Sequence, residues 1–171
     1  MISDLSSSGF AATNRWVADI TYIRLQREFV YLAVILEAFS RKVVGWALDR
    51  TLASRLPLAA LQRAIRERQA PPGWVHHSDR GVQYASQDYR AVLSAAGIVG
   101  SMSRKANCYD NAPMESFFHT LKTELVHHRQ YKTRAEAQRD IFAFIEGFYN
   151  RTRLHSAIGY TAPIQMELKA A

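Results

Sequence analysis

The sequence predicts one α/β domain, a mixed sheet with helices on both faces. Three observations predict this class. The 171 residues are enough for one domain with a sizeable core. Three strand-like segments come first, and their short connections favour antiparallel neighbours. After them, short apolar segments alternate with helix-like segments, so the expected order is β-β-β-α-β-α-β-α-α.

The three leading strands are expected at residues 16–23, 29–36 and 42–48. The first mixes apolar and β-branched residues around a single acid, Asp19. The second is almost wholly apolar, as expected for a strand that is buried on both faces. The second strand is therefore expected to be covered on both of its faces.

Caps and breakers divide the rest of the chain. Ser54 is expected to cap a helix with Pro57 in its first turn, and Ser86 to cap another that ends at Gly97, where a left-handed residue belongs. Further strands are expected at 74–77 and 98–102, a polar loop at 103–111, and helices at about 111–127 and from 133 onward.

Both late helices show an apolar face. In the helix at 111–127 this face is expected to be Met114, Phe117, Leu121 and Leu125. The last helix opens with the capping box Thr133 to Glu136. Its expected buried stripe is Ala137, Ile141, Phe144, Ile145 and Phe148.

Charge and cysteine content narrow the function classes. The net charge is +7 and is spread along the chain, so a polyanionic partner is expected to meet the folded body and not a basic tail. The single cysteine, Cys108, excludes an internal disulfide framework. No apolar run is long enough to span a bilayer, and no signal peptide is visible at the start, so a reducing, cytoplasmic location is expected.

Three carboxylates occupy positions that suggest chemistry. Asp19 lies mid-strand among apolar residues, Asp79 follows a short strand, and Glu115 shares one helical stripe with His119 and Lys122. Each also has an ordinary interpretation, as a strand-edge acid, a turn former or a helix N-terminal acid.

If the three acids converge, their repulsion must be compensated. Two carboxylates 4 Å apart repel by about 4 kcal/mol at an effective dielectric constant of 20. Oxygen-only ligands favour Mg²⁺ or Mn²⁺, and two such ions roughly 3.5–4 Å apart suit in-line phosphoryl displacement. A basic body with such a site indicates cutting or joining of nucleic acid.

Several stretches of this sequence, which include the three acids, resemble the integrase-type catalytic core of bacterial insertion-sequence transposases, in the retroviral integrase and RNase H-like superfamily. The matching stretches are WVADITYI (16–23), HSDRGVQY (77–84), NCYDNAPMESFF (107–118), and YNRTRLH (149–155) followed by GYTAP (159–163). Asp79 and Glu115 are separated by 35 residues, the family's D,D-35-E spacing, and Lys122 follows Glu115 by seven positions.

The resemblance implies an RNase H-like fold with a five-stranded sheet, and a site in which Asp19, Asp79 and Glu115 hold two Mg²⁺ or Mn²⁺ ions. It implies that water first cuts a strand at the element's end to free a 3′-OH, which then attacks another DNA strand directly. It also implies that Lys122 contacts the DNA end near the phosphate that is cut. The remaining candidate DNA contacts are Arg104, Lys105, Tyr109, Asn111, His119, Arg151, Arg153 and His155.

The expected organisation is a flexible N-terminal arm at 1–13, an integrase catalytic core at 14–166 and a C-terminal tail at 167–171. The expected partners are transposon terminal repeats, target DNA, and a second copy in a homodimer or larger synaptic assembly. The upstream DNA-recognition part used by such transposases is expected to be missing, and the protein to be bacterial and nucleoid-associated. Two residues depart from the family pattern: Glu37 stands in place of Asp, and Ala106 in place of Gly.

Other interpretations remain open. His76, His77, Cys108 and His119 could be zinc ligands, although their spacing fits no standard finger. Tyr149 could be a nucleophile assisted by Arg151, Arg153 and His155, whereas a helix terminus or plain phosphate contacts explain the same residues. Tyr109 or Phe117 could stack on unpaired bases. Alternatives for the whole chain are a non-catalytic DNA-binding or assembly module and a structure-selective nuclease on the same fold.

Overall fold

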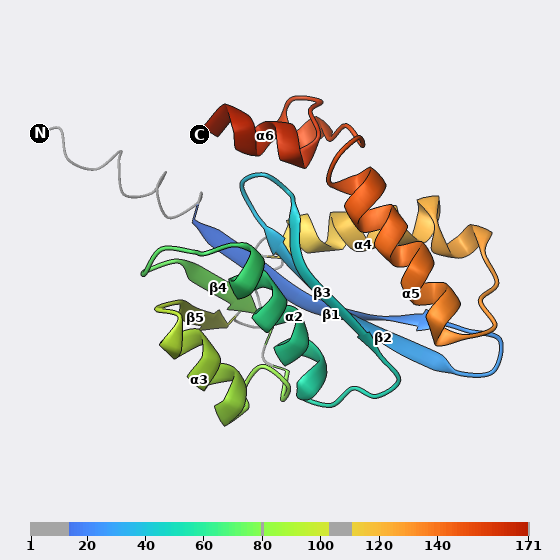
Figure 1. The fold of residues 1–171 in the computed structure, drawn as a ribbon, viewed down its shortest axis with the longest axis horizontal. Coiled ribbons are helices and arrows are strands. Elements are labelled where there is room, and N and C mark those ends of the chain that lie inside the picture. Colours follow the sequence, from blue (N-terminus) through green and yellow to red (C-terminus); the bar gives the residue numbers. More distant parts are fainter. Residues whose placement is uncertain (1–13, 80, 103–110, 171) are drawn as a thin grey trace, which may run out of the picture.

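A five-stranded mixed sheet forms the centre of the molecule (Figure 1). The computed structural model describes residues 14–79, 81–102 and 111–170. The strands lie in the order β3-β2-β1-β4-β5. Their bounds are β1 Arg15–Arg24, β2 Phe29–Glu37, β3 Val43–Asp49, β4 Val75–Ser78 and β5 Val99–Met102. All five strands lie where the sequence predicts them.

The pairing of β1 changes along its length. On one side it pairs with β2 in antiparallel fashion from Trp16 to Arg24. On the other side it runs parallel to β4, but only Arg15, Trp16 and Val17 are in register with that strand. Beyond Val17, β4 ends and the edge of β1 faces a different environment. This divergence creates the space in which Asp19 lies.

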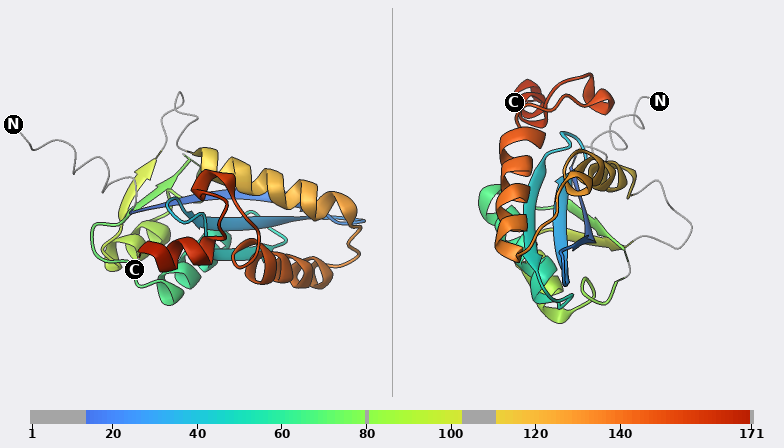
Figure 2. Two further views of the ribbon diagram at one scale, coloured as in Figure 1. Left: turned by 90° about the horizontal axis from the view of Figure 1, so that it is seen from above. Right: turned by 90° about the vertical axis from the view of Figure 1, so that its right-hand side faces the viewer.

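Helices cover both faces of the sheet (Figure 2). The bounds of the helices are α2 Arg55–Glu67, α3 Gln87–Ala95, α4 Ala112–Glu124, α5 Arg134–Phe142 and α6 Pro163–Ala170. Shorter segments are the 3₁₀ turns η2 Val126–His128 and η4 Ser156–Ile158 and the π-helix η3 Ala143–Tyr149. In Figure 2, α4 lies on one side of the sheet, and α2 and α3 lie on the other.

Side-chain alternation divides the core into two layers. Val17 of β1 packs with the layer that includes α4, whereas its neighbours Trp16 and Ala18 pack with the layer that includes α2 and α3. Both faces of β2 are buried, as the apolar sequence predicted. The predicted apolar face of α4 is also confirmed, because Met114, Phe117 and Leu121 are fully buried and Leu125 is 9% exposed.

The last helix departs from the predicted stripe at its end. Phe148 was expected in the core, but it is 41% exposed, and Tyr149 is buried instead. The cause is the π-helix, in which the amide of Asn150 donates to the carbonyl of Ile145, five residues earlier. One extra residue per turn moves the inward position from Phe148 to Tyr149. The sequence prediction assumed an α-helical period throughout and was wrong here.

Two of the three predicted caps form. The Ser86 hydroxyl accepts a hydrogen bond from the Tyr89 amide, and the Thr133 hydroxyl accepts one from the Glu136 amide. Gly97 has the left-handed conformation expected of it, with φ of 71°. The prediction for Ser54 was wrong: its φ of −59° and ψ of −24° are already helical, so its side chain makes no capping bond.

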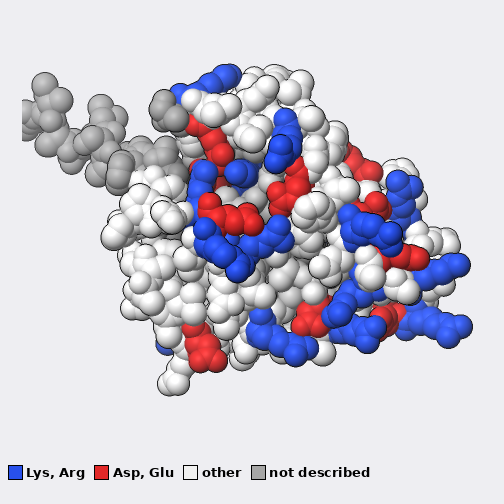
Figure 3. All heavy atoms as spheres, viewed as in Figure 1, with Lys and Arg blue, Asp and Glu red and all other residues white. Residues whose placement is uncertain are grey.

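A buried ion-pair network ties α6 to the sheet. The Arg68 guanidinium donates to Glu37 at the end of β2 and also pairs with Glu167 of α6, which contacts Lys42 as well. Helix α6 spans Pro163–Ala170, so residues 167–170 of the expected C-terminal tail form its last turn. On the face of the molecule seen in Figure 3, which has the same view as Figure 1, acidic side chains mostly lie against basic ones.

Within the described residues, no helix is both long enough and apolar enough to cross a membrane.

Candidate active site

Asp19 and Asp79 meet at the edge where β1 and β4 separate. Asp19 lies two residues beyond Val17, the last residue of β1 in register with β4, and Asp79 follows the end of β4 directly. Carboxyl ends of parallel strands share one edge of a sheet, and functional groups gather there. The short pairing between the two strands thus brings two acids distant in sequence to the same place.

Both aspartates line one cavity of about 320 Å³. Its other lining residues come from β1, β2 and the segments that follow β3 and β4. They are Ile20, Thr21, Tyr22, Tyr31, Leu52, Gln83 and Tyr84. The cavity therefore combines two carboxylates with aromatic walls.

The electrostatics of Asp19 reflect burial and repulsion. The pKa of its carboxyl group is raised from 3.8 to about 6. Burial is the largest cause, the negative charges of Asp79 and Glu115 add to it, and a 2.8 Å hydrogen bond from the Ile20 amide opposes it. No described lysine or arginine forms an ion pair with Asp19, Asp79 or Glu115. Within the described part of the chain, these three acids are therefore not neutralised by an ion pair.

Gly81 fixes the orientation of the Asp79 side chain. Its amide donates to Asp79 Oδ1 at 2.7 Å. A Cβ atom at position 81 would lie 2.8 Å from that oxygen and 2.9 Å from Gln83 Oε1, too close for either to stay in place. The glycine after Asp79 thus permits a tight turn in which a backbone amide holds the carboxylate.

Glu115 lies in the first turn of α4 and is exposed. Its charge reaches Asp19, but it does not line the cavity that the two aspartates share. Across residues 14–79, 81–102 and 111–170, no three His, Cys, Asp or Glu side chains are gathered as a metal-binding group. The structure thus brings two of the predicted acids together and places the third nearby on an adjacent helix.

The donor set nevertheless fits a hard divalent cation. The three side chains offer only carboxylate oxygens, which Mg²⁺ and Mn²⁺ prefer. Burial and, to a smaller extent, the charges of Asp79 and Glu115 disfavour ionisation of Asp19, and a bound cation would favour it.

Lys122 lies at the rim of the cavity. Its Nζ is 4.9 Å from the ring centroid of Tyr22, a lining residue whose side chain is 57% exposed. His119, one turn earlier on α4, is exposed, and Asn111 precedes the helix without capping it through its side chain. A cation thus lies against an aromatic ring that lines the cavity of Asp19 and Asp79.

The second predicted group of residues is Tyr149 with Arg151, Arg153 and His155, and three of these four make contacts within the fold. Arg153 forms a two-oxygen ion pair with Glu124 of α4, and His155 is buried edge-on against Tyr149, with ring centroids 4.5 Å apart. Burial raises the pKa of Tyr149, the opposite of what activates a nucleophile. These contacts fit the helix-terminus interpretation. Arg151 is exposed.

The other candidate residues either lie outside the described residues or are buried. Arg104, Lys105, Ala106, Cys108 and Tyr109 lie outside the described residues. His76, considered as a zinc ligand, is buried and hydrogen-bonded to the Tyr89 hydroxyl at 2.6 Å. Phe117 is fully buried in the core, as the apolar-face interpretation expected.

Sequence reasoning missed the aromatic walls of the cavity. Tyr22 and Tyr84 are far apart in sequence, and neither is charged or part of a recognisable ligand pattern. The available signal was position: each lies within five residues of a candidate aspartate, on the segment that follows it.

Fold and site together define an RNase H-like core. Among solved structures, the chain is similar to a chain of the simian T-cell lymphotropic virus intasome in complex with PP2A regulatory subunit B56 gamma, with a TM-score of 0.72 and 18% identity over 90% of this chain and 54% of that one. It is also similar to the HTLV-2 integrase catalytic core domain in complex with magnesium, with a TM-score of 0.67 and 15% identity over 91% of this chain and 96% of that one. At such identities the likeness concerns the fold.

Sequence comparison gives the family. Models of the integrase core domain match residues 11–108 and 115–170, and the chain belongs to this family. It is 46% identical to the "insertion element IS600 uncharacterized 31 kDa protein" of Shigella sonnei, over 86% of this chain and 54% of that protein. It is 42% identical to the transposase InsF for insertion sequence IS3A of Escherichia coli, over 97% of this chain and 57% of that protein. The chain thus spans little more than half the length of these curated relatives.

Proposed function

We propose that residues 14–166 form the catalytic core of an insertion-sequence transposase, a metal-dependent polynucleotidyl transferase. The observation that carries this proposal is the cavity that Asp19 and Asp79 share, where burial first, and the charges of Asp79 and Glu115 second, disfavour ionisation of Asp19. An acidic cavity in a chain of net charge +7 suits a reaction at a phosphodiester that the basic body attracts.

The proposed reaction has two steps. In the first, water attacks a phosphorus atom at the transposon end, the P–O3′ bond breaks, and a 3′-OH and a 5′-phosphate are released. In the second, this 3′-OH attacks a phosphodiester of another strand, forming a new P–O3′ bond and releasing a 3′-OH from that strand. Each step exchanges one phosphoester bond, so no covalent protein–DNA intermediate is needed.

The residues have distinct proposed roles. Asp19, Asp79 and Glu115 would hold two Mg²⁺ or Mn²⁺ ions, which when bound supply Lewis-acid stabilisation of the charge on the transferring phosphate. Gly81 keeps the Asp79 carboxylate oriented through its amide. Lys122 at the cavity rim would contact the phosphate backbone of the DNA end.

Further DNA contacts are proposed for Arg104, Lys105, Tyr109, Asn111, His119, Arg151, Arg153 and His155. We expect Arg151 and His119, which are exposed, to contribute directly. Arg153 and His155, which are engaged with Glu124 and Tyr149, would contribute by supporting the surface around Arg151. Terminal repeats and target DNA would be the substrates, two ends would be joined by a dimer or larger assembly, and sequence recognition would come from another domain or protein.

The test is a paired cleavage and joining assay with Mg²⁺ or Mn²⁺. Asp19→Asn, Asp79→Asn and Glu115→Gln should each abolish nicking of an element end and joining of a pre-cut end. Asp88→Asn, an exposed acid in the first turn of α3, is the matched control and should behave like the wild type. Nicking without joining would indicate a structure-selective nuclease. DNA binding with neither reaction would indicate an assembly module.

A further inference from the structure

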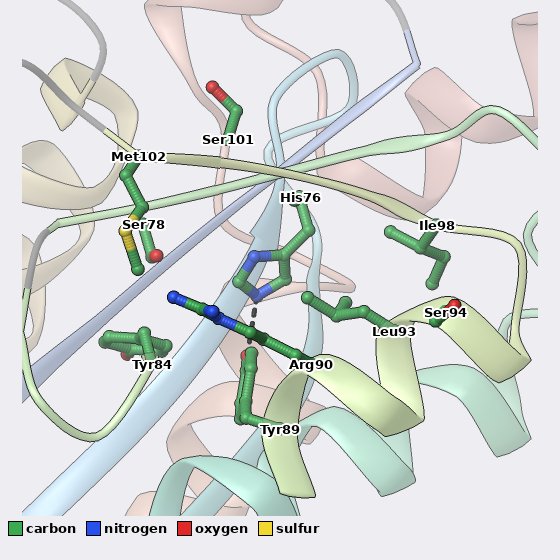
Figure 4. Close-up of a pocket in the computed structure, with 11 residues that line it drawn as sticks. His76, Ser78, Tyr84, Tyr89, Arg90, Leu93, Ser94, Ile98, Ser101 and Met102 are labelled. Carbon is green, nitrogen blue, oxygen red and sulfur yellow. Dashed lines mark hydrogen bonds between the residues drawn. The ribbon is translucent and has the colours of Figure 1, made fainter. Parts of the chain in front are cut away.

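A second cavity lies beside the candidate active site. It has a volume of about 370 Å³ and is enclosed between α3, β4 and β5 (Figure 4). Tyr84 lines both cavities, and Ser78, which lines this one, directly precedes Asp79. The two spaces are therefore neighbours that share an aromatic wall.

The second cavity has an apolar side and a polar side. Leu93, Ile98 and Met102 provide the apolar side, and Ser78 and Ser94 add hydroxyl groups. The hydroxyl of Ser101 points away from the cavity and is hydrogen-bonded to His77 (Figure 4). None of the described residues that line it is an aspartate or a glutamate. This composition, apolar surface with a few polar groups, is that of sites for organic ligands.

The floor of the cavity is uncharged at neutral pH. His76 and Tyr89 are hydrogen-bonded to each other at 2.6 Å and are both buried. Burial lowers the pKa of His76 to about 4, so its ring is neutral well above that pH. The electrostatic character of the cavity therefore depends on another residue.

Arg90 supplies that charge. Figure 4 shows its side chain extending from α3 into the cavity, on the side of Tyr84 and Ser78. No described residue forms a hydrogen bond or ion pair with its guanidinium group. An unpaired guanidinium group between hydroxyls and an aromatic ring is suited to a phosphate and to the face or edge of a base.

We infer that this second cavity binds one unpaired nucleotide of the DNA strand that occupies the active site. The inference rests on the proposed function for its choice of DNA. The base would lie against the apolar and aromatic side chains, and its phosphate would contact Arg90. The volume is near the lower end of the usual range for ligand sites, about 300–1,000 Å³, which suits a nucleotide and excludes a duplex. Entry therefore requires local unpairing, which is easiest at a strand end.

Gly100 offers a way to block the cavity. It lines the space, and a Cβ atom there would meet only Leu93 Cδ1, at an ordinary contact distance of 3.6 Å. Gly100→Ala should therefore leave the cavity open, whereas Gly100→Phe should place a ring inside it. Arg90→Gln removes the charge at an exposed position without filling the cavity, and Arg66→Gln, in the last turn of α2, is its matched control.

The experiment uses the full 171-residue chain, labelled with ¹⁵N, in EDTA. A single-stranded deoxytetranucleotide, a duplex closed at both ends by non-nucleotide linkers, and inorganic phosphate are titrated separately. The tetranucleotide should shift the amide signals of Gly100 and Ser101. Its affinity should fall at least about fivefold in Gly100→Phe and in Arg90→Gln, but not in Gly100→Ala or Arg66→Gln. The closed duplex should not shift these amide signals.

Three results would overturn the inference. The first is no shift at Gly100 and Ser101 with the tetranucleotide. The second is unchanged affinity in both Gly100→Phe and Arg90→Gln. The third is an equal response to inorganic phosphate alone, which would make the cavity a simple anion site. Because these measurements contain no metal, their outcome is independent of cleavage: a chain that binds the tetranucleotide in this cavity but never cuts DNA would refute the proposed function instead.

Discussion

Two acids on neighbouring strands, Glu37 and Asp19, have opposite electrostatic surroundings. Glu37, at the end of β2, is buried and bonded to Arg68. Asp19, on β1, is partly buried and has two acids within electrostatic reach and no cationic partner among the described residues. Burial raises the pKa of both carboxyl groups, but at Glu37 the charge and hydrogen bonds of Arg68 counteract the effect. A buried carboxylate that is paired maintains the fold, and one that is left unpaired is available for function.

The largest expected effect concerns activity. Asp19→Asn should lower the rate of strand cleavage by about three orders of magnitude or more, because losing the proposed metal ligand would remove several kcal/mol of transition-state stabilisation. Glu37→Gln should leave the rate within a few-fold of the wild type. Single-turnover nicking of a labelled element end measures both. Equal losses in the two variants would erase the distinction between the two acids.

The same pair of variants should change stability in opposite directions. Glu37→Gln breaks a largely buried pair and leaves Arg68 without its main partner, so the free energy of unfolding should fall by about 2–3 kcal/mol. Asp19→Asn should raise it by about 2 kcal/mol at pH 8 without metal, because ionisation above pH 6 costs the folded state. Urea unfolding in EDTA tests both signs. A destabilised Asp19→Asn would show that the acid supports the fold.

His76 extends the comparison to a buried base. Its pKa is lowered to about 4 in the folded protein from 6.5, so the unfolded chain binds its proton first. Stability should therefore be lost as pH falls from about 6.5 toward 4, by about 2 kcal/mol between pH 7.5 and 5 from this residue. Urea unfolding of the wild type and of His76→Gln at the two pH values isolates the contribution. The variant should lose less stability than the wild type on acidification, and an equal loss would contradict the prediction.

The smallest expected effect is at Lys122, which serves the proposed site from its rim. Lys122→Ala should weaken binding of an element-end duplex about three- to tenfold and lower the slope of log K against log salt by about 1. Fluorescence anisotropy over a salt series measures both, with Lys132→Ala, an exposed lysine before α5, as the matched control. An unchanged slope would remove Lys122 from the phosphate contacts.

Local patterns in the sequence were sufficient for the sheet and most of the helices. The mix of apolar and β-branched residues at 16–23 and the apolar run at 29–36 identified strands because their side chains have to match the two layers. The meeting of Asp19 and Asp79 was also predictable, since strand ends share an edge of the sheet. Glu115 was singled out by the helical stripe that it shares with His119 and Lys122, and the structure places it on α4 without lining the cavity.

What the sequence did not reveal depends on distant contacts or on a change of helical period. The Arg68 link joins residues from β2, the end of α2 and α6, and no local pattern relates them. That link also gives Glu37, the departure from the family's Asp, a physical role, because its carboxylate reaches Arg68. The exchange of Phe148 for Tyr149 follows from hydrogen bonds five residues apart, which the hydrophobic pattern does not encode.

Because of the π-helix, the fold is sensitive to the number of residues in the segment Ala143–Tyr149. Immediately after it, the Asn150 side chain donates to the carbonyl of Val43 and accepts from the Val43 amide, closing the end of β3. Deleting one residue from 143–149 would restore an ordinary turn and rotate every later side chain by about 100°. Asn150 would then swing away from β3, and Tyr149 would leave the ring of Phe117. A single substitution within residues 143–149 keeps the number of residues and so the direction of the later side chains. A deletion there would lose the contacts of Tyr149 and Asn150.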